Sequence, residues 1–122
     1  MPKSATSYAK GLTGEEKALE YLMKRGMAPL ERRYHSPYGE IDLIMQDGDA
    51  IAFVEVKARS AGRRGAGLCA ITKAKQRRLV QTALAYIAQH RPECPLRFDA
   101  LEITPQGIVY VKNAFDAGAD FG

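Results

Sequence analysis

The stretch EIDLIMQDGDAIAFVEVK (40–57) holds two runs of sheet-forming residues on either side of an Asp-Gly pair. An Asp-Gly pair between alternating runs is among the strongest short signals for a β-hairpin. The stretch therefore predicts two antiparallel strands, 40–46 and 49–57. The second strand carries Glu55 and Lys57, two charges that a strand buried on both faces would not hold. These residues form a solvated face, an internal ion pair or part of a functional site.

Two helices and three further strands are predicted outside this hairpin. The first helix opens at Thr13, which has capping-box spacing to Glu16, and Gly26 is well placed to end it. In chain order the predicted elements are helix 13–25, strand 28–34, the hairpin, helix 72–90, and strands 97–103 and 108–112. The second helix provides a crossover between strands. The order α-β-β-β-α-β-β thus predicts a single-domain α/β fold with a mixed central sheet of about five strands flanked by helices.

The composition indicates one globular domain. The chain has 122 residues, of which 46% are hydrophobic and 26% charged, enough for a single core. We expect residues 13–115 to form the domain, between a flexible tail 1–12 and a second tail 116–122. No run approaches ~18 apolar residues, and the N-terminus lacks the apolar core of a secretory signal, so a cytoplasmic protein without membrane contact is expected. Cys69 and Cys94 lack CxxC spacing and are expected to be free thiols.

The hairpin register predicts which side chains share a face of the sheet. With Asp47 and Gly48 as the two turn residues, Leu43 faces Ala52, and opposed residues project to the same side. One face then carries four charged residues, Glu40, Asp42, Glu55 and Lys57. The other face carries four apolar residues, Ile41, Leu43, Val54 and Val56.

The charged face brings carboxylates together. Asp42 would be a diagonal neighbour of Glu55, about 7–8 Å away. Two carboxylates about 4 Å apart repel by ~4 kcal/mol at an effective dielectric near 20. A divalent cation would remove this repulsion, and Mg²⁺ or Mn²⁺ prefers such oxygen ligands. Lys57, one pleat further on, could hold a phosphate oxygen or help a water molecule to attack.

Each predicted helix points one polar side chain toward the sheet. Glu15 falls on the same side of a helical wheel as Ala18 and Leu22. It either complements the positive N-terminus of the helix or supports a metal ion. Gln76 begins the apolar stripe of the second helix. It either binds a metal-bound water or a phosphate, or caps a sheet edge.

The charges of the chain are unevenly distributed. The net charge is +4, and the segment 57–78 contains no acidic residue. Its cations are Lys57, Arg59, Arg63, Arg64, Lys73, Lys75, Arg77 and Arg78. Such a block either attracts phosphate backbones or forms a solvated basic face.

Seven ordered segments resemble those of the YraN-like predicted endonucleases, a bacterial family related to archaeal Holliday junction resolvases. They are GEEKALEYL (14–22), LERRY (30–34), GEIDLI (39–44), FVEVKAR (53–59), KAKQRR (73–78), RFDALEI (97–103) and NAF (113–115). The arrangement also resembles the wider PD-(D/E)XK, or restriction-endonuclease-like, superfamily, in which a metal-binding Asp precedes Glu-x-Lys on the next strand. Two differences stand out. Arg33 replaces an Asn common in the family, a change expected to be harmless, and GRRGAGLCAIT (62–72) is Gly-rich where the family tends to have Pro and acidic residues.

The resemblance implies a small metal-dependent endonuclease that acts on DNA, with branched or otherwise structured DNA as one substrate class. Asp42 and Glu55 would bind Mg²⁺ or Mn²⁺, aided by the backbone carbonyl of Val56. Lys57 would orient or deprotonate the attacking water and stabilise charge on phosphorus. Glu15 would support the metal ion through a bound water molecule, and Gln76 would position a phosphate or a water molecule. Glu40 would either support the metal ligands from outside the coordination sphere or fix the turn before the strand.

The same resemblance assigns the basic residues to the DNA backbone, through Arg59, Arg63, Arg64, Lys73 and Lys75. Two other functions also fit the residues. One is a non-catalytic nucleic-acid-binding module that keeps the nuclease fold, and the other is a purely structural face of acidic–basic ion pairs. Cleavage of two strands would suit a symmetric homodimer.

Overall fold

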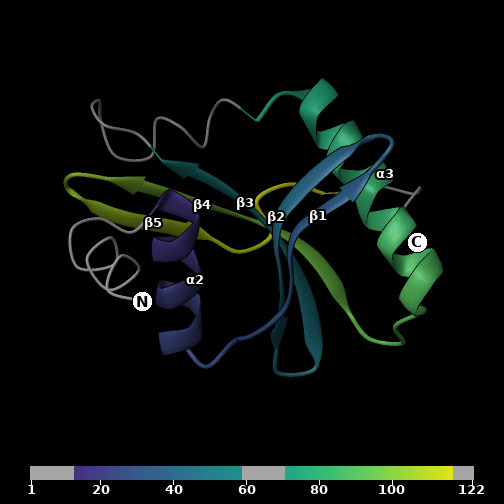
Figure 1. Cartoon of the computed structure of the whole chain (residues 1–122), viewed down its shortest axis with the longest axis horizontal. Coiled ribbons are helices and arrows are strands. Elements are labelled where there is room, and N and C mark those ends of the chain that lie inside the picture. Colours follow the sequence, from purple (N-terminus) through teal and green to yellow (C-terminus); the bar gives the residue numbers. More distant parts are fainter. Residues whose placement is uncertain (1–12, 59–70, 117–122) are drawn as a thin grey trace, which may run out of the picture.

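The computed structural model describes residues 13–58 and 71–116 and has the predicted order of elements (Figure 1). The elements are α2 (Gly14–Lys24), β1 (Ala28–Ser36), β2 (Gly39–Asp47), β3 (Ala50–Ala58), α3 (Lys73–His90), β4 (Leu96–Thr104) and β5 (Gly107–Val111). Most of the two predicted tails and the Gly- and Arg-rich segment lie outside the described residues. Neither α2 nor α3 is long and apolar enough to cross a membrane.

The five strands form one mixed sheet in the order β1-β2-β3-β4-β5. Neighbouring strands are antiparallel except β3 and β4, which run parallel. A parallel pair needs a crossover connection, and α3 lies between these two strands in the chain. The predicted α/β fold with a five-stranded mixed sheet is therefore confirmed.

The two helices cover opposite faces of the sheet, and each forms its own core cluster. Ala18 and Leu22 of α2 pack with Ala52 and Val54 of β3. Leu79, Val80, Ala83 and Tyr86 of α3 pack on the alternate residues of the same strand, Ile51 and Phe53. Because alternate residues of a strand point to opposite faces, β3 is buried on both sides.

The ends of α2 follow the predicted signals. Thr13 and Glu16 form the complete capping box, with each side chain accepting a hydrogen bond from the other residue's backbone N–H, at 3.1 and 2.9 Å. Gly26 has φ +91°, and Met27 N–H donates to the carbonyl of Leu22. Positive φ costs glycine little, so the chain can reverse here. The capping box places Glu15 in the first turn, beside the sheet.

The register of the β2–β3 hairpin differs from the prediction by two residues. Asp47 pairs with Ala50 and Leu43 with Val54, so the turn residues are Gly48 and Asp49 rather than Asp47 and Gly48. Gly48 has φ +63° at the first central position, where a type II′ turn requires glycine. A shift by an even number leaves every residue on its face. The regular pairing ends at Leu43 and Val54, one residue short of Asp42 and Glu55.

The predicted apolar face is wrong at one position. Leu43 belongs to the cluster under α2, as expected, but Ile41 belongs to the cluster under α3. The alternation of β2 therefore breaks at Asp42. In the neighbouring strand Arg33 has φ +51°, between paired residues on either side. The sheet is locally distorted at this point, and Asp42 leaves the regular pleat.

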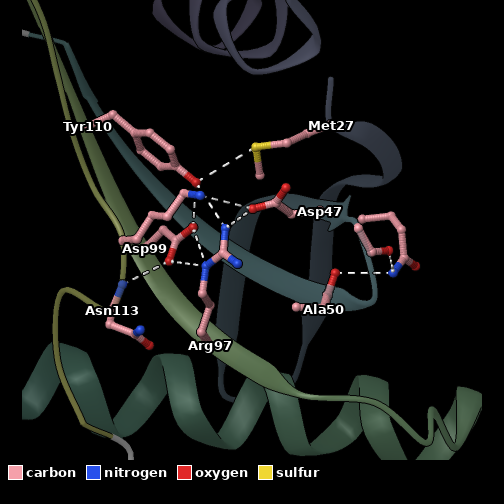
Figure 2. A network of polar contacts seen from close by, with 10 residues as sticks. Met27, Asp47, Ala50, Arg97, Asp99, Tyr110 and Asn113 are labelled. Atoms are coloured by element: carbon pink, nitrogen blue, oxygen red, sulfur yellow. Dashed lines mark hydrogen bonds and ion pairs between the residues drawn. The ribbon is translucent and has the colours of Figure 1, made fainter. Parts of the chain in front are cut away.

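A network of buried polar contacts fixes the other end of β3 (Figure 2). The carboxylate of Asp99 accepts hydrogen bonds from Arg97 Nε at 3.0 and 3.1 Å and from the Tyr110 hydroxyl at 2.6 Å. Arg97 also binds Asp47 at 2.6 Å, and Asn113 N–H donates to Asp99. The network thus joins β4, β5 and the hairpin. All charged members shown have partners, which is the condition under which buried charges are tolerated.

Candidate active site

Asp42 and Glu55 approach each other where the regular pairing of β2 and β3 ends. Asp42 Oδ2 accepts a hydrogen bond of 2.8 Å from the backbone N–H of Val56. Besides burial, the charge of the neighbouring Glu55 carboxylate opposes the ionisation of Asp42 and raises the pKa of that group. Glu55 is 8% exposed. The structure therefore holds Asp42 at the backbone of Val56, the residue next to Glu55.

The surroundings of Asp42 oppose its ionisation. Burial, followed by the charge of Glu55, raises the pKa of Asp42 to about 7, although the hydrogen bond from Val56 acts in the other direction. A divalent cation would reverse this effect, because an opposite charge favours the carboxylate form. The pair is thus more stable with a bound cation than with two unscreened negative charges.

Glu15 extends the acidic group from the first turn of α2. Its side chain is only 12% exposed, and Oε1 accepts a hydrogen bond of 2.8 Å from Arg33 Nε. The other oxygen, Oε2, is buried and has no hydrogen-bond partner among the described residues. A buried carboxylate oxygen without a donor is costly. Its position fits the predicted metal-supporting role better than the complement to the helix N-terminus alone, which does not require burial.

Arg33 has a place in the site that sequence reasoning missed. Its backbone is left-handed at φ +51°, a conformation that Asn adopts far more readily than Arg. The Asn that the resemblance leads us to expect here would suit this backbone. In this chain the guanidinium group, whose side chain is 66% exposed, pairs with Glu15 instead. The replacement expected to be harmless adds a positive charge beside the carboxylates.

Glu15, Arg33 and Asp42 line a pocket of about 360 Å³, whereas Glu55 is not among its lining residues. It lies where the N-terminus of α2 meets the first three strands, and its lining consists of Thr13, Gly14, Glu15, Arg33, Glu40, Asp42, Val56 and Ala58. Glu40 is at the open side, where its side chain is 39% exposed and 3.6 Å from His35 Nε2. The pocket therefore presents carboxylate oxygens, and the Val56 backbone, to a ligand.

Two lysines approach the acidic pair from different elements. Lys57 follows Glu55 on β3, and Lys75 reaches Glu55 from the first turn of α3, with Nζ 2.6 Å from Oε2. The pKa of Lys57 is lowered by a hydrogen bond with Lys75, by burial and by the charge of Lys75. A lysine whose pKa is lowered is more often in the neutral form, which is the form that can accept a proton. Lys57 therefore has the environment of a general base.

Lys75 was predicted only as a contact to the DNA backbone. The rotation of α3 about its own axis explains why Lys75 reaches Glu55. The predicted stripe ran through Gln76, Val80, Ala83 and Ile87, whereas the buried residues also include Leu79, Thr82 and Tyr86. Lys75 continues this second row at helical spacing. The signal was present in the sequence, but only the packing of α3 shows which row faces Glu55.

Gln76 is engaged away from the acidic pair. Its amide Nε2 donates to the carbonyl of Ile71 at 3.1 Å, just before the α3 N-cap Thr72. This contact differs from both predicted roles, because the carbonyl belongs to the segment before the helix and not to a sheet edge, a water molecule or a phosphate. Lys73 is exposed at the start of α3. The other predicted DNA contacts, Arg59, Arg63 and Arg64, lie outside the described residues.

The donor set can be tested against the metals that the sequence implies. In residues 13–58 and 71–116, no three His, Cys, Asp or Glu side chains are grouped closely enough to hold an ion by themselves. Mg²⁺ is usually bound by only one or two carboxylates, with water and substrate phosphate as its remaining ligands. Asp42 and Glu55 supply such a pair, and Glu15 Oε2 has an unused acceptor nearby. The residues present therefore fit Mg²⁺ or the similar Mn²⁺.

Comparison with known proteins places the chain in a family. The family model described as "Uncharacterised protein family UPF0102" matches residues 14–103. The UPF0102 protein of Nitrosomonas europaea is 43% identical over 110 residues, 88% of this chain and 93% of that protein. Its counterpart in Janthinobacterium sp. (strain Marseille) is 40% identical over 116 residues, 95% of this chain and 94% of that protein. These similarities confirm the resemblance to the YraN-like proteins, and the chain belongs to the UPF0102 family.

Proposed function

We propose that the protein is a Mg²⁺- or Mn²⁺-dependent nuclease that hydrolyses phosphodiester bonds in DNA. The observation that carries this proposal is the polar cluster at the end of β3, where Asp42 accepts a hydrogen bond from Val56 and the neighbouring Glu55 pairs with Lys75. Carboxylates held against their own repulsion are typical of functional sites. Acidic groups that bind a cation, next to lysines that suit phosphate, favour phosphoryl chemistry over other reactions.

The proposed ligands of the ion are the carboxylates of Asp42 and Glu55 and the carbonyl of Val56. When bound, the ion would supply positive charge against the phosphate and lower the pKa of a water molecule. Glu15 Oε2, which is buried and has no partner among the described residues, would accept a hydrogen bond from water in the pocket. Gln76 is not included, because its amide is already bonded to Ile71.

Lys57 is the proposed base. A water oxygen forms a bond to phosphorus while its proton passes to the Lys57 amine, and the bond from phosphorus to the ester oxygen breaks. The departing oxygen takes a proton from solvent. The lowered pKa of Lys57 makes the neutral amine more available at neutral pH than that of an ordinary lysine. The basic side chains of α3, with Lys73 the first of them, would hold the DNA backbone.

A panel of DNA substrates tests the proposal. Linear duplex, single-stranded, flapped and four-way DNA are incubated with Mg²⁺ or Mn²⁺ and the wild-type protein. We expect metal-dependent cleavage of at least one substrate, and Glu55→Gln and Lys57→Met should each lower the rate by roughly 100-fold, the scale for losing a group that acts on the transition state.

Glu93→Gln is the matched control, because Glu93 is exposed and distant in sequence from the pocket residues; it should cleave like the wild type. If no substrate is cut in the presence of metal while DNA is still bound, the protein is a non-catalytic DNA-binding module and the proposed nuclease activity is wrong.

A further inference from the structure

The ammonium group of Lys75 lies at the carboxylate that the metal ion would need. Lys75 Nζ is 2.6 Å from Glu55 Oε2, and the Glu55 side chain is 9% exposed. Lys75 itself is 26% exposed and is anchored through α3, whose N-cap Thr72 accepts a hydrogen bond from the Lys75 backbone N–H at 3.1 Å. The backbone of Lys75 is therefore fixed, and its charge is placed inside the acidic group.

This ion pair gives buried Glu55 a counter-charge. A buried carboxylate left without a partner is strongly destabilising. Repulsion from the neighbouring Asp42 carboxylate would destabilise it further. Lys75 offsets the charge of Glu55, because its ammonium group lies 2.6 Å from Glu55 Oε2. The lysine thus performs in the folded chain what a cation would perform at the same oxygen.

The ammonium group of Lys75 and a divalent ion compete for the carboxylate of Glu55. Both are positive, and an ion on Glu55 would lie within a few ångströms of the ammonium group. Lysine has a long flexible stem and binds phosphate as a point charge. Because Lys75 is partly exposed, its ammonium group has a route toward solvent, where a substrate phosphate would approach.

We propose that Lys75 is the resident counter-ion of the acidic pair, that a divalent cation displaces it from Glu55, and that the released ammonium group then binds a phosphate of the DNA. This inference rests on the proposed nuclease function and adds a mechanism to it. Metal binding and DNA binding become coupled, because the cation sets free a phosphate contact. By linkage, DNA must strengthen metal binding by the same factor.

The first test measures Mn²⁺ binding by calorimetry in the absence of DNA. Lys75→Gln should bind Mn²⁺ more tightly than the wild type, by about 10-fold, because the ion no longer competes with an ammonium group. Lys75→Arg keeps a positive charge and should bind like the wild type. Arg77→Gln removes an equal charge from the exposed side of the same helix and should change little.

Lys75→Gln leaves Glu55 without its counter-charge and could unfold for that reason. Thermal unfolding of this variant with and without Mn²⁺ therefore separates a loss of structure from a change in metal binding. We expect a lower melting temperature without metal and a larger rise on adding Mn²⁺ than in the wild type. A rise no larger than that of the wild type contradicts the counter-ion role.

The second test measures binding of a fluorescein-labelled DNA duplex with Ca²⁺ or with EDTA. In the wild type, Ca²⁺ should tighten binding by about 10-fold, within the usual range of coupling between sites. In Lys75→Gln this gain should fall to about 2-fold. An equal increase in DNA affinity on adding Ca²⁺ to the two proteins would show that the Lys75 ammonium group does not move from the Glu55 carboxylate to a DNA phosphate.

The outcomes separate the inference from the proposed function. Equal Mn²⁺ affinity in the wild type and Lys75→Gln overturns the counter-ion role and leaves the metal-dependent nuclease standing. Binding by Lys75→Gln alone supports the counter-ion role in its strongest form. Absence of Mn²⁺ binding in both proteins overturns the counter-ion role together with the proposed metal site.

Discussion

Asp42 combines two properties that a residue selected for stability alone would not have. It lies where β2 leaves its regular pleat, and its surroundings raise its pKa to about 7. The neutral form of the Asp42 carboxyl group is therefore more populated in the folded protein than in the unfolded chain. A carboxyl group kept partly protonated near neutral pH is ready to exchange its proton for a metal ion. The residue thus lowers stability in the metal-free protein and contributes to binding when a cation is present.

The first prediction concerns the pH dependence of stability in EDTA. The folded pKa of Asp42 is raised above the unfolded value of 3.8, so its contribution to stability is present below about pH 4 and is lost as the pH rises to about 7. Asp42→Asn cannot ionise and should escape this loss. The free energy of unfolding of Asp42→Asn, relative to the wild type, should therefore increase by about 1–3 kcal/mol between pH 5 and pH 8.

Urea unfolding at the two pH values measures this difference. Asp49→Asn is the control, because Asp49 is exposed in the hairpin turn and should follow the wild type. A difference between Asp42→Asn and the wild type that does not change with pH contradicts the assigned environment of Asp42.

Some site residues could be predicted from the sequence because strand periodicity fixes their face. Glu55 and Lys57 are two apart on β3, so an error of two residues in the register left both on their predicted face, whereas the break in alternation at Asp42 was not predicted. Lys75 and Arg33 were not predictable in this way. Their positions depend on which row of α3 packs on the sheet and on a left-handed residue in β1, and both are set by tertiary contacts.

At the scale of elements, the approach of α2 to β3 positions Glu15. A Cβ atom on Gly14 would lie 2.6 Å from Cβ of Ala58, closer than two carbon atoms can pack. Glycine at this position therefore lets the first turn of the helix touch the end of the strand. Glu15, the next residue, is carried into the pocket beside Asp42.

Gly14→Ala should consequently move the start of α2 away from β3. Overpacking of this kind costs about 1–3 kcal/mol, and a displacement of Glu15 by about 1 Å could lower the cleavage rate by up to ~100-fold. Urea unfolding and the cleavage assay measure the two effects.

The double variant Gly14→Ala/Ala58→Gly is the matched test, because it exchanges the two side chains across the contact. It should recover most of the stability and activity lost in the single variant. A single variant as stable and active as the wild type would show that the contact between α2 and β3 does not position Glu15.

The elements themselves were easier to predict than their pairing. Capping-box spacing located the start of α2, and alternation located β2 and β3, because these signals are local. The turn was misplaced because Asp-Gly favours a turn without specifying which residue comes first in it. Gly48, which has positive φ, occupies the first central position of the turn. Asp47 lies before the turn, and its carboxylate accepts a hydrogen bond from Arg97.

At the scale of the molecule, one sheet carries both the cores and the site. The clusters under α2 and α3 share β3, and the network of Arg97 and Asp99 fixes one end of that sheet. Glu55 lies toward the other end, where β2 and β3 lose their regular pairing. The stable region thus supports an end at which like charges are held together, which is the usual relation between a rigid scaffold and a functional site.

The acidic pair is the centre of the account, and its affinity for a metal ion can be measured without any DNA substrate. Mn²⁺ is titrated by calorimetry into the wild type, Asp42→Asn and Glu55→Gln, each shown by circular dichroism to be folded. We predict that the wild type binds Mn²⁺ and that each substitution abolishes the binding, because the ion needs both carboxylates. Unchanged binding in either variant, or absence of binding in both the wild type and Lys75→Gln, would contradict the metal site.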